Sequence, residues 1–214
     1  MKTKFYYLLT LFFFGNLFFS CQNDDSDTVF NWECPAVLEH FKINGISSQN
    51  IEITESEYDI LKNINENSVV LWNKFILSYR FETEYIAKRK SINTTGGLMA
   101  LSCEGSGYNG SKIGVDTLFI TTTKNYNENY SAGDTINQIV KISNWNYYYN
   151  QEVDNLKSIS NYIDTNTERI SSETFDIKIM EAPSIDGEHI FEITYKLNNG
   201  EVFKHQSSPV QLKK

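Results

Sequence analysis

Alternation of apolar and polar side chains is clearest over Phe75–Tyr85. The odd positions of this stretch carry Phe, Leu, Tyr, Phe, Thr and Tyr, and the even positions after Ile76 carry Ser, Arg, Glu and Glu. A period of two places one set of side chains on a core and the other set in water. The pattern predicts a half-buried β-strand, into which Val69–Trp72 leads.

Weaker patterns of the same kind predict further strands. These are Phe41–Ile46 and Ile51–Ile53 on either side of a Ser-Ser-Gln-Asn turn, Asp116–Thr123, Thr174–Met180, His189–Leu197, Glu201–Gln206 and a last edge at Val210 and Leu212. Asn198-Asn199-Gly200 separates two of these runs, and Asn-Gly in this setting predicts a β-hairpin because both residues accept positive φ.

Helical spacing is confined to short stretches. Apolar residues recur at spacings of three and four in Asp154–Ile163, which predicts a helix, and Ile136–Ile142 is expected to be short, buried and partly helical. Glu55–Asn67 fits either a helical turn or a loop. The sum is a mainly β fold of about seven to nine strands, for which we favour an immunoglobulin-like β-sandwich with one short helical insertion at 144–166.

The N-terminus has the pattern of a targeting segment. Lys2 and Lys4 precede Phe5–Phe19, an almost wholly apolar stretch that is short for a membrane-spanning helix. Residues 1–20 are therefore expected to be a signal peptide that is not part of the fold.

The end of that segment resembles the lipobox of bacterial lipoproteins. Leu17-Phe18-Phe19-Ser20-Cys21 has the small residue and the cysteine of that motif, although Phe18 stands where the family usually has Leu. The resemblance implies that the Cys21 thiol carries a diacylglycerol and becomes the mature N-terminus, so that acyl chains hold the protein on a membrane. An ordinary secretory signal followed by a chance cysteine is the alternative.

The acidic residues after Cys21 carry a second resemblance. Cys21-Gln22-Asn23-Asp24-Asp25 is similar to the export signal of surface-exposed lipoproteins of the Bacteroidota, which implies an outer-membrane, surface-exposed location. The alternative is a solvated acidic linker on a protein facing the periplasm. On either interpretation, residues 21–32 form an acidic tether and residues 33–214 a single domain.

Thr28 lies in this tether. Asp27-Thr28-Val29 resembles the Asp-Thr-aliphatic O-glycosylation sequon of the Bacteroidota, as do Asp116-Thr117-Leu118 and Asp134-Thr135-Ile136. Thr28 is the preferred acceptor of the three, because the other two threonines lie at predicted strand starts.

Charge narrows the range of partners. The chain has 27 acidic against 19 basic residues, with a formal net charge of −8. An acidic surface disfavours nucleic acids and anionic head groups, so the only membrane contact expected is through the N-terminal lipid.

Two cysteines remain once Cys21 is assigned to lipid. In an oxidising compartment Cys34 and Cys103 are expected to form a disulfide, and two buried free thiols are the alternative. His40, His189 and His205 have no ligand spacing with these cysteines, so neither a metal nor a cofactor is expected.

Few motifs point to chemistry. Four aromatic residues lie among asparagines and suit a platform on which sugar rings stack: Trp145, Tyr147, Tyr148 and Tyr149. The alternative is that they are buried side chains of an edge strand, which would have the same sequence. The glycine-rich Gly105–Gly110 is not followed by a helical pattern, so it predicts a turn and not a phosphate site. We find no paired-carboxylate, HExxH or GxSxG motif and expect a protein without catalytic residues.

A fuller resemblance concerns most of the mature chain. Its stretches are Cys34-Pro35, Phe41-Lys42-Ile43, Ala100–Cys103, Gly114–Thr123, Tyr130–Asn137 and Phe191–Gln206. Together they resemble a family of Bacteroidota lipoproteins that carry a domain of unknown function, which implies a location but no activity. We therefore expect a binding or structural module for a glycan or a protein. The alternatives are an accessory subunit of an outer-membrane assembly and a carbohydrate-active enzyme.

Overall fold

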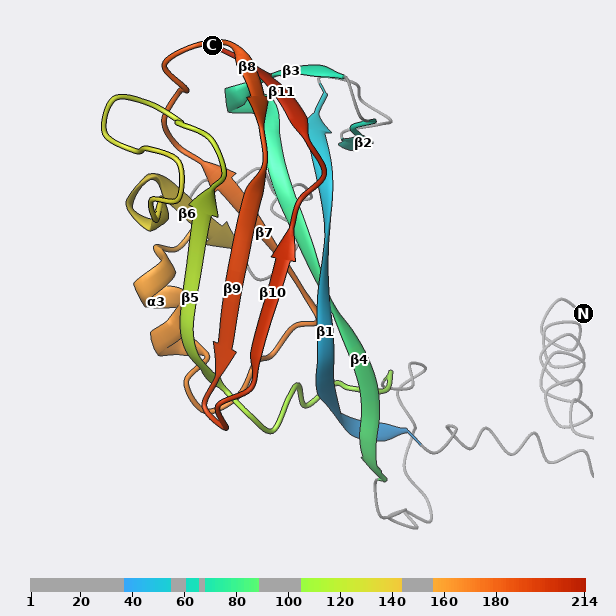
Figure 1. Cartoon of the computed structure of the whole chain (residues 1–214). Helices are drawn as coiled ribbons and strands as arrows, with labels where there is room; N and C mark the ends of the chain where they lie inside the picture. Colours follow the sequence, from blue (N-terminus) through green and yellow to red (C-terminus); the bar gives the residue numbers. More distant parts are fainter. Residues whose placement is uncertain (1–36, 55–60, 66–67, 89–104, 144–155) are drawn as a thin grey trace, which may run out of the picture. The chain divides into compact units, whose positions relative to one another are not determined.

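A computed structural model of the chain describes residues 37–54, 61–65, 68–88, 105–143 and 156–214 (Figure 1). The chain divides into two units, Met1–Cys34 and Pro35–Lys214, and all of the described residues belong to the second. Within these ranges the fold is mainly β, as the sequence predicts, with three sheets and one α-helix. No helix among the described residues is long and apolar enough to cross a membrane.

The largest sheet has the strand order β2-β1-β4-β7-β6, and every neighbouring pair is antiparallel. The bounds of its strands are Leu38–Ile53 for β1, Leu61–Asn63 for β2, Phe75–Lys88 for β4, Val140–Ser143 for β6 and Thr174–Ile179 for β7. β1 and β4 lie side by side along most of their length (Figure 1). The odd positions from Phe75 to Phe81 are buried whereas Arg80 and Glu82 are exposed, which confirms the predicted alternation up to Phe81. Tyr85, predicted on the core face, is exposed, so the alternation does not report burial at the end of this strand.

β1 is one strand where the sequence predicts two strands and a turn. The expected turn residues Ser47–Asn50 pair in register with Leu77–Arg80 of β4. Ser48 Oγ lies 2.9 Å from His205 Nε2, and Asn50 Nδ2 donates to the Ser208 carbonyl at 2.8 Å. The predicted turn is therefore wrong, because these polar side chains bond to residues of the C-terminal region while their backbone stays extended.

The second sheet has the order β10-β9-β5 and confirms the predicted hairpin. Its strands are Val115–Thr122 (β5), Phe191–Leu197 (β9) and Val202–Gln206 (β10). The Leu197 amide donates to the Glu201 carbonyl at 2.9 Å across the turn, and Gly200 has a φ of +88°. A residue with a Cβ is disfavoured at that φ, which explains why glycine ends this turn.

Aromatic side chains join the two sheets. Phe81 of β4 and Tyr195 of β9 meet edge to face with ring centroids 5.1 Å apart, and Phe75 stacks on Phe191 at 5.9 Å. Phe175 of β7 lies 5.8 Å from Tyr195. All of these rings are buried, so each contributes on the order of 1.5–3 kcal/mol by burial, and each favourable pair adds about 0.5–1.5 kcal/mol.

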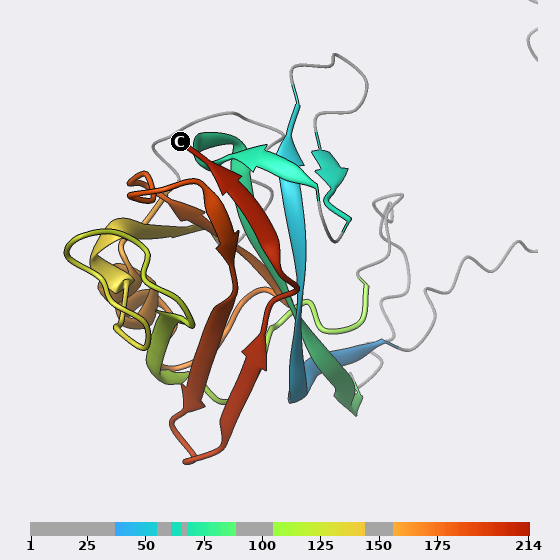
Figure 2. The same cartoon turned by 45° about the horizontal axis from the view of Figure 1, so that its top comes forward.

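The third sheet has the order β3-β11-β8, formed by Val69–Leu71, Val210–Lys213 and Gly187–His189. β11 pairs in parallel with β3 and antiparallel with β8, and Figure 2 shows β11 beside β3 with the C-terminus at its end. The C-terminal strand is therefore central and not the predicted edge. His189 belongs to β8 and not to the strand that follows it. Both corrections come from pairing between distant segments, which local patterns do not report.

The number of strands is also larger than predicted. The described residues contain eleven strands, of which β2, β3 and β8 have three residues each. Strands this short show no periodicity, and β2 in particular replaces the helical turn or loop expected at this point of the chain.

Helices are few and short in the described ranges. The 3-10 helix η2 (Asn137–Ile139) leads into β6, which confirms a partly helical segment there. The α-helix α3 (Ile159–Thr165) begins later than the predicted Asp154, because Ser158 caps it by accepting a hydrogen bond from the Asn161 amide at 3.2 Å.

Candidate functional site

The residues that the sequence singles out for function lie outside the described residues. They are Cys21, Thr28, Cys34, Cys103, Trp145, Tyr147, Tyr148 and Tyr149. For the aromatic segment 144–155, the described residues on either side show where the chain leaves and rejoins the sheet.

The two ends of the aromatic segment 144–155 are held together. Ile142 in β6 and Lys157 form an antiparallel bridge with two backbone hydrogen bonds of 2.9 Å, one in each direction. The chain therefore leaves β6 after Ser143 and returns to the same edge of the sheet before α3.

α3 fixes the returning end of this segment. Ile159 and Tyr162 are buried, and the Tyr162 hydroxyl lies 3.0 Å from the Tyr195 hydroxyl of β9. At the other end of the helix, the Asn166 carbonyl accepts a hydrogen bond from the Val115 amide at 2.9 Å. The helix is thus tied to the second sheet at its middle and at its C-terminal cap, which fixes the element that follows the aromatic segment.

A polar row crosses the large sheet where the segment leaves it. Ser78 of β4, Asp176 of β7 and Ser143 of β6 are cross-strand neighbours. They lie on the face opposite the core, because Phe175 and Ile177 on either side of Asp176 point into the core. Asp176 and Ser143 are nevertheless buried.

Two ionisable groups of β7 have pKa values shifted in opposite directions on this face. Burial raises the pKa of the Asp176 carboxyl, and a hydrogen bond with the Ser78 side chain opposes that shift. Burial lowers the pKa of Lys178 to about 8, and its ammonium donates to the Asn73 carbonyl. In both groups the charged form is the disfavoured one.

This arrangement is poorly suited to the capture of a free ion, because burial works against the charged forms of Asp176 and Lys178. Within the described ranges no group of three or more His, Cys, Asp or Glu side chains could hold a metal ion. Shifted pKa values in a cluster are a recognised mark of functional sites.

The glycine-rich Gly105–Gly110 forms a turn, as predicted. The Gly110 amide donates to the Gly107 carbonyl at 2.8 Å, and both glycines have positive φ. The chain then passes through a bridge at Ser111 into β5 without a helix, so the loop lacks the helix N-terminus that a phosphate site requires.

Sequence reasoning missed the polar row. The alternation in β7 places Asp176 and Lys178 on the outer face, where a charged residue is ordinarily solvated. Nothing in the local pattern indicates that this outer face is buried.

Comparison with known proteins adds no relative: no protein-family model, no curated protein and no solved structure matches the chain.

Proposed function

We propose that this chain is a lipid-anchored surface protein that binds glycans, with segment 144–155 as its recognition segment. The observation that carries the proposal is the Ile142–Lys157 bridge, which holds both ends of a long aromatic segment at one point of a rigid sheet. Binding residues are found disproportionately on the segments that connect the elements of a rigid scaffold. Aromatic faces stack on sugar rings, and the four asparagines of the segment can bond hydroxyl groups.

The proposed scaffold is an immunoglobulin-like sandwich, and strand order supports it. If β1, β4, β5, β6, β7, β9 and β10 are lettered A to G in chain order, the large sheet reads A-B-E-D and the second sheet reads G-F-C. These are the two sheets of the constant-type immunoglobulin fold. β2 and the sheet β3-β11-β8 are then additions to that scaffold.

The aromatic core is consistent with this assignment. Strands B and F of antibody domains are joined by a disulfide, whereas here the corresponding β4 and β9 meet through Phe81–Tyr195 and Phe75–Phe191. Cys34 and Cys103 lie in neither strand, so a bond between them would serve a different purpose.

A bond between Cys34 and Cys103 would instead tie the N-terminal end of the domain to the segment that precedes the Gly105–Gly110 turn. Downstream of the two cysteines, residues 38–41 and 107–111 lie side by side. The Gly107 amide donates to the Leu38 carbonyl at 2.7 Å, and Phe41 forms a parallel bridge with Ser111. The offset between the two segments shifts along these pairs, so they do not assign a partner to either cysteine. The proposed disulfide is supported by the pair of cysteines that remains once Cys21 is assigned to lipid.

Location follows from the N-terminus. We propose that Cys21 carries the lipid, that residues 21–32 form the tether with Thr28 as a glycan acceptor, and that the protein is displayed on the surface of an outer membrane of the Bacteroidota type. The lipobox-like residues and the acids after Cys21 support this assignment.

A glycan array tests the binding function. The soluble chain from Val29 onward should bind a subset of glycans, and Trp145→Ala should reduce that signal at least tenfold. Phe119→Ala is the matched control, because Phe119 is an exposed aromatic residue on β5 and should leave binding unchanged. Equal signals from the wild type and Trp145→Ala would contradict the proposal.

An accessory subunit of an outer-membrane assembly is the second candidate. It is favoured by Val69 and Leu71, which are exposed on β3 at the edge of the third sheet. Co-purification of a membrane partner that depends on these two side chains, in a chain without glycan binding, would favour this function over the first.

A further inference from the structure

His189 is a buried histidine without a hydrogen-bond partner. It ends β8, where it pairs with Val210 of β11, and its exposed fraction is 3%. Both of its ring nitrogens are buried and have no partner in the described part of the chain. Such a site accepts a neutral imidazole and disfavours an imidazolium.

Aromatic rings line this site. Tyr126 meets the imidazole edge to face at 5.3 Å, and Phe191 stacks on it at 6.2 Å. The Tyr126 hydroxyl donates to the Glu181 carbonyl at 2.7 Å, so it is engaged away from the imidazole. His189 thus joins three parts of the fold: β8 of the third sheet, β9 of the second, and the loop that follows β5.

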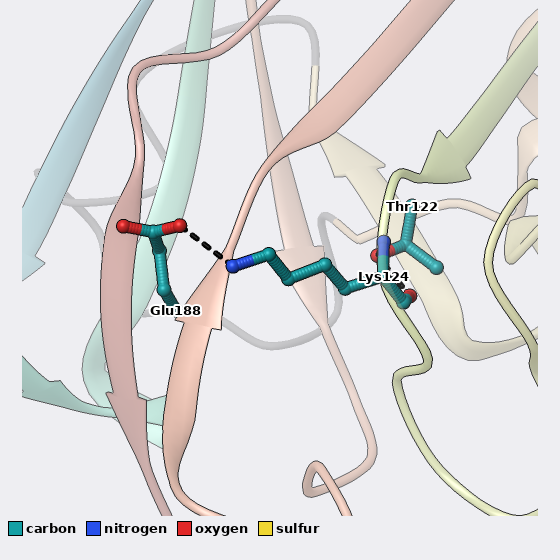
Figure 3. Close-up of polar contacts among 3 residues, drawn as sticks. All are labelled: Thr122, Lys124 and Glu188. Carbon is teal, nitrogen blue, oxygen red and sulfur yellow. Dashed lines mark hydrogen bonds and ion pairs between the residues drawn. The ribbon is translucent and has the colours of Figure 1, made fainter.

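The nearest charges do not supply a counter-ion. Lys124 and Glu188 form an ion pair of 2.7 Å, in which Lys124 is exposed and Glu188 is partly buried. Figure 3 shows this pair. Burial lowers the pKa of His189; Lys124 lowers it further and Glu188 opposes. Burial, and after it the charge of Glu181, raises the pKa of Tyr126, which keeps its hydroxyl neutral. The partners from β9 and β11 are Phe191 and Val210, which carry no charge.

We propose that His189 is an acid-sensitive contact whose protonation releases the sheet β3-β11-β8 from Tyr126 and Phe191. The imidazole can be charged only in water, so proton uptake requires that β8 and β11 move off the aromatic rings. Acidification therefore loosens one end of the domain and leaves the aromatic layer between the two larger sheets in place.

The direction of the pH effect follows from the lowered pKa. The open state has an ordinary histidine pKa of about 6.5 and binds a proton that the closed state does not. The closed state is fully favoured above about pH 7, and it loses stability as the pH falls below 6.5. Between pH 7.5 and 5.0 the opening equilibrium should rise by up to about thirtyfold.

Hydrogen exchange of the full chain measures this opening. After correction for intrinsic exchange rates, amides of 187–191 and 210–213 should lose protection by up to about thirtyfold between pH 7.5 and 5.0, whereas amides of β4 should not. His189→Phe keeps an aromatic ring that cannot be protonated, so it should abolish the acid response. His40→Gln and His205→Gln change the other two histidines of the chain and should retain it.

A titration of the wild-type imidazoles by NMR provides a test that needs no variant. His189 should remain neutral well below pH 6.5 in the closed state. A midpoint near 6.5 without loss of protection would overturn the proposal, and so would an acid response that persists in His189→Phe. If His189→Phe does not fold, His189→Gln replaces it with the same expected outcome.

Discussion

At the residue scale, the buried tyrosine hydroxyls differ in whether they have a partner. Tyr162 and Tyr195 share a hydrogen bond of 3.0 Å between α3 and β9. The Tyr79 hydroxyl on β4 is equally buried and has no partner among the described residues. An unsatisfied buried hydroxyl costs about 1–3 kcal/mol, so the same Tyr→Phe change should have opposite effects at the two places.

We expect Tyr195→Phe to lower the free energy of unfolding by about 1–3 kcal/mol, because it leaves the buried Tyr162 hydroxyl without its hydrogen-bond partner. Tyr79→Phe should raise it by about 1 kcal/mol, since it removes a group that has no partner. Urea denaturation of both variants at neutral pH measures the difference. Equal destabilisation by the two variants would show that Tyr79 has a partner as well.

At the scale of elements, β11 holds the third sheet together. It lies between β3 and β8, and its Val210 and Leu212 are buried. Deletion of 210–214 removes both strand pairings and two buried side chains, which is a loss of about 3–6 kcal/mol by burial alone. Thermal unfolding should show this loss, while deletion of Lys214 alone should have little effect. A shorter chain as stable as the wild type would mean that β3 and β8 are held by other contacts.

Elements with local signals could be predicted from the sequence, and elements made by distant pairing could not. β4 has the alternation of a half-buried strand and the β9–β10 hairpin has its Asn-Gly turn, so both are confirmed. β1 was divided wrongly because Ser47–Asn50 have turn composition, although they pair with β4 and bond to the C-terminal region. The burial of Asp176 could not be predicted either, because periodicity identifies the two faces of a strand and not what covers them.

At the scale of the whole molecule, the proposed Cys34–Cys103 disulfide would stabilise the domain. The two residues are 69 positions apart, and a loop of that length gives about 4 kcal/mol on the chain-entropy model. We expect Cys34→Ser/Cys103→Ser to lower the free energy of unfolding by about this amount. A reducing agent should have the same effect on the wild type and none on the double variant. Two free thiols in the denatured, unreduced domain, in place of none, would rule the bond out.

The proposed lipid on Cys21 would determine the location of the whole molecule, since the proposed tether, display and oxidising compartment all depend on it. The most direct measurement is metabolic labelling with palmitate, followed by membrane fractionation of the wild type and Cys21→Ser. The account predicts a labelled, membrane-bound wild type and an unlabelled variant released from the membrane. A Cys21→Ser chain that is labelled and membrane-bound like the wild type would contradict it.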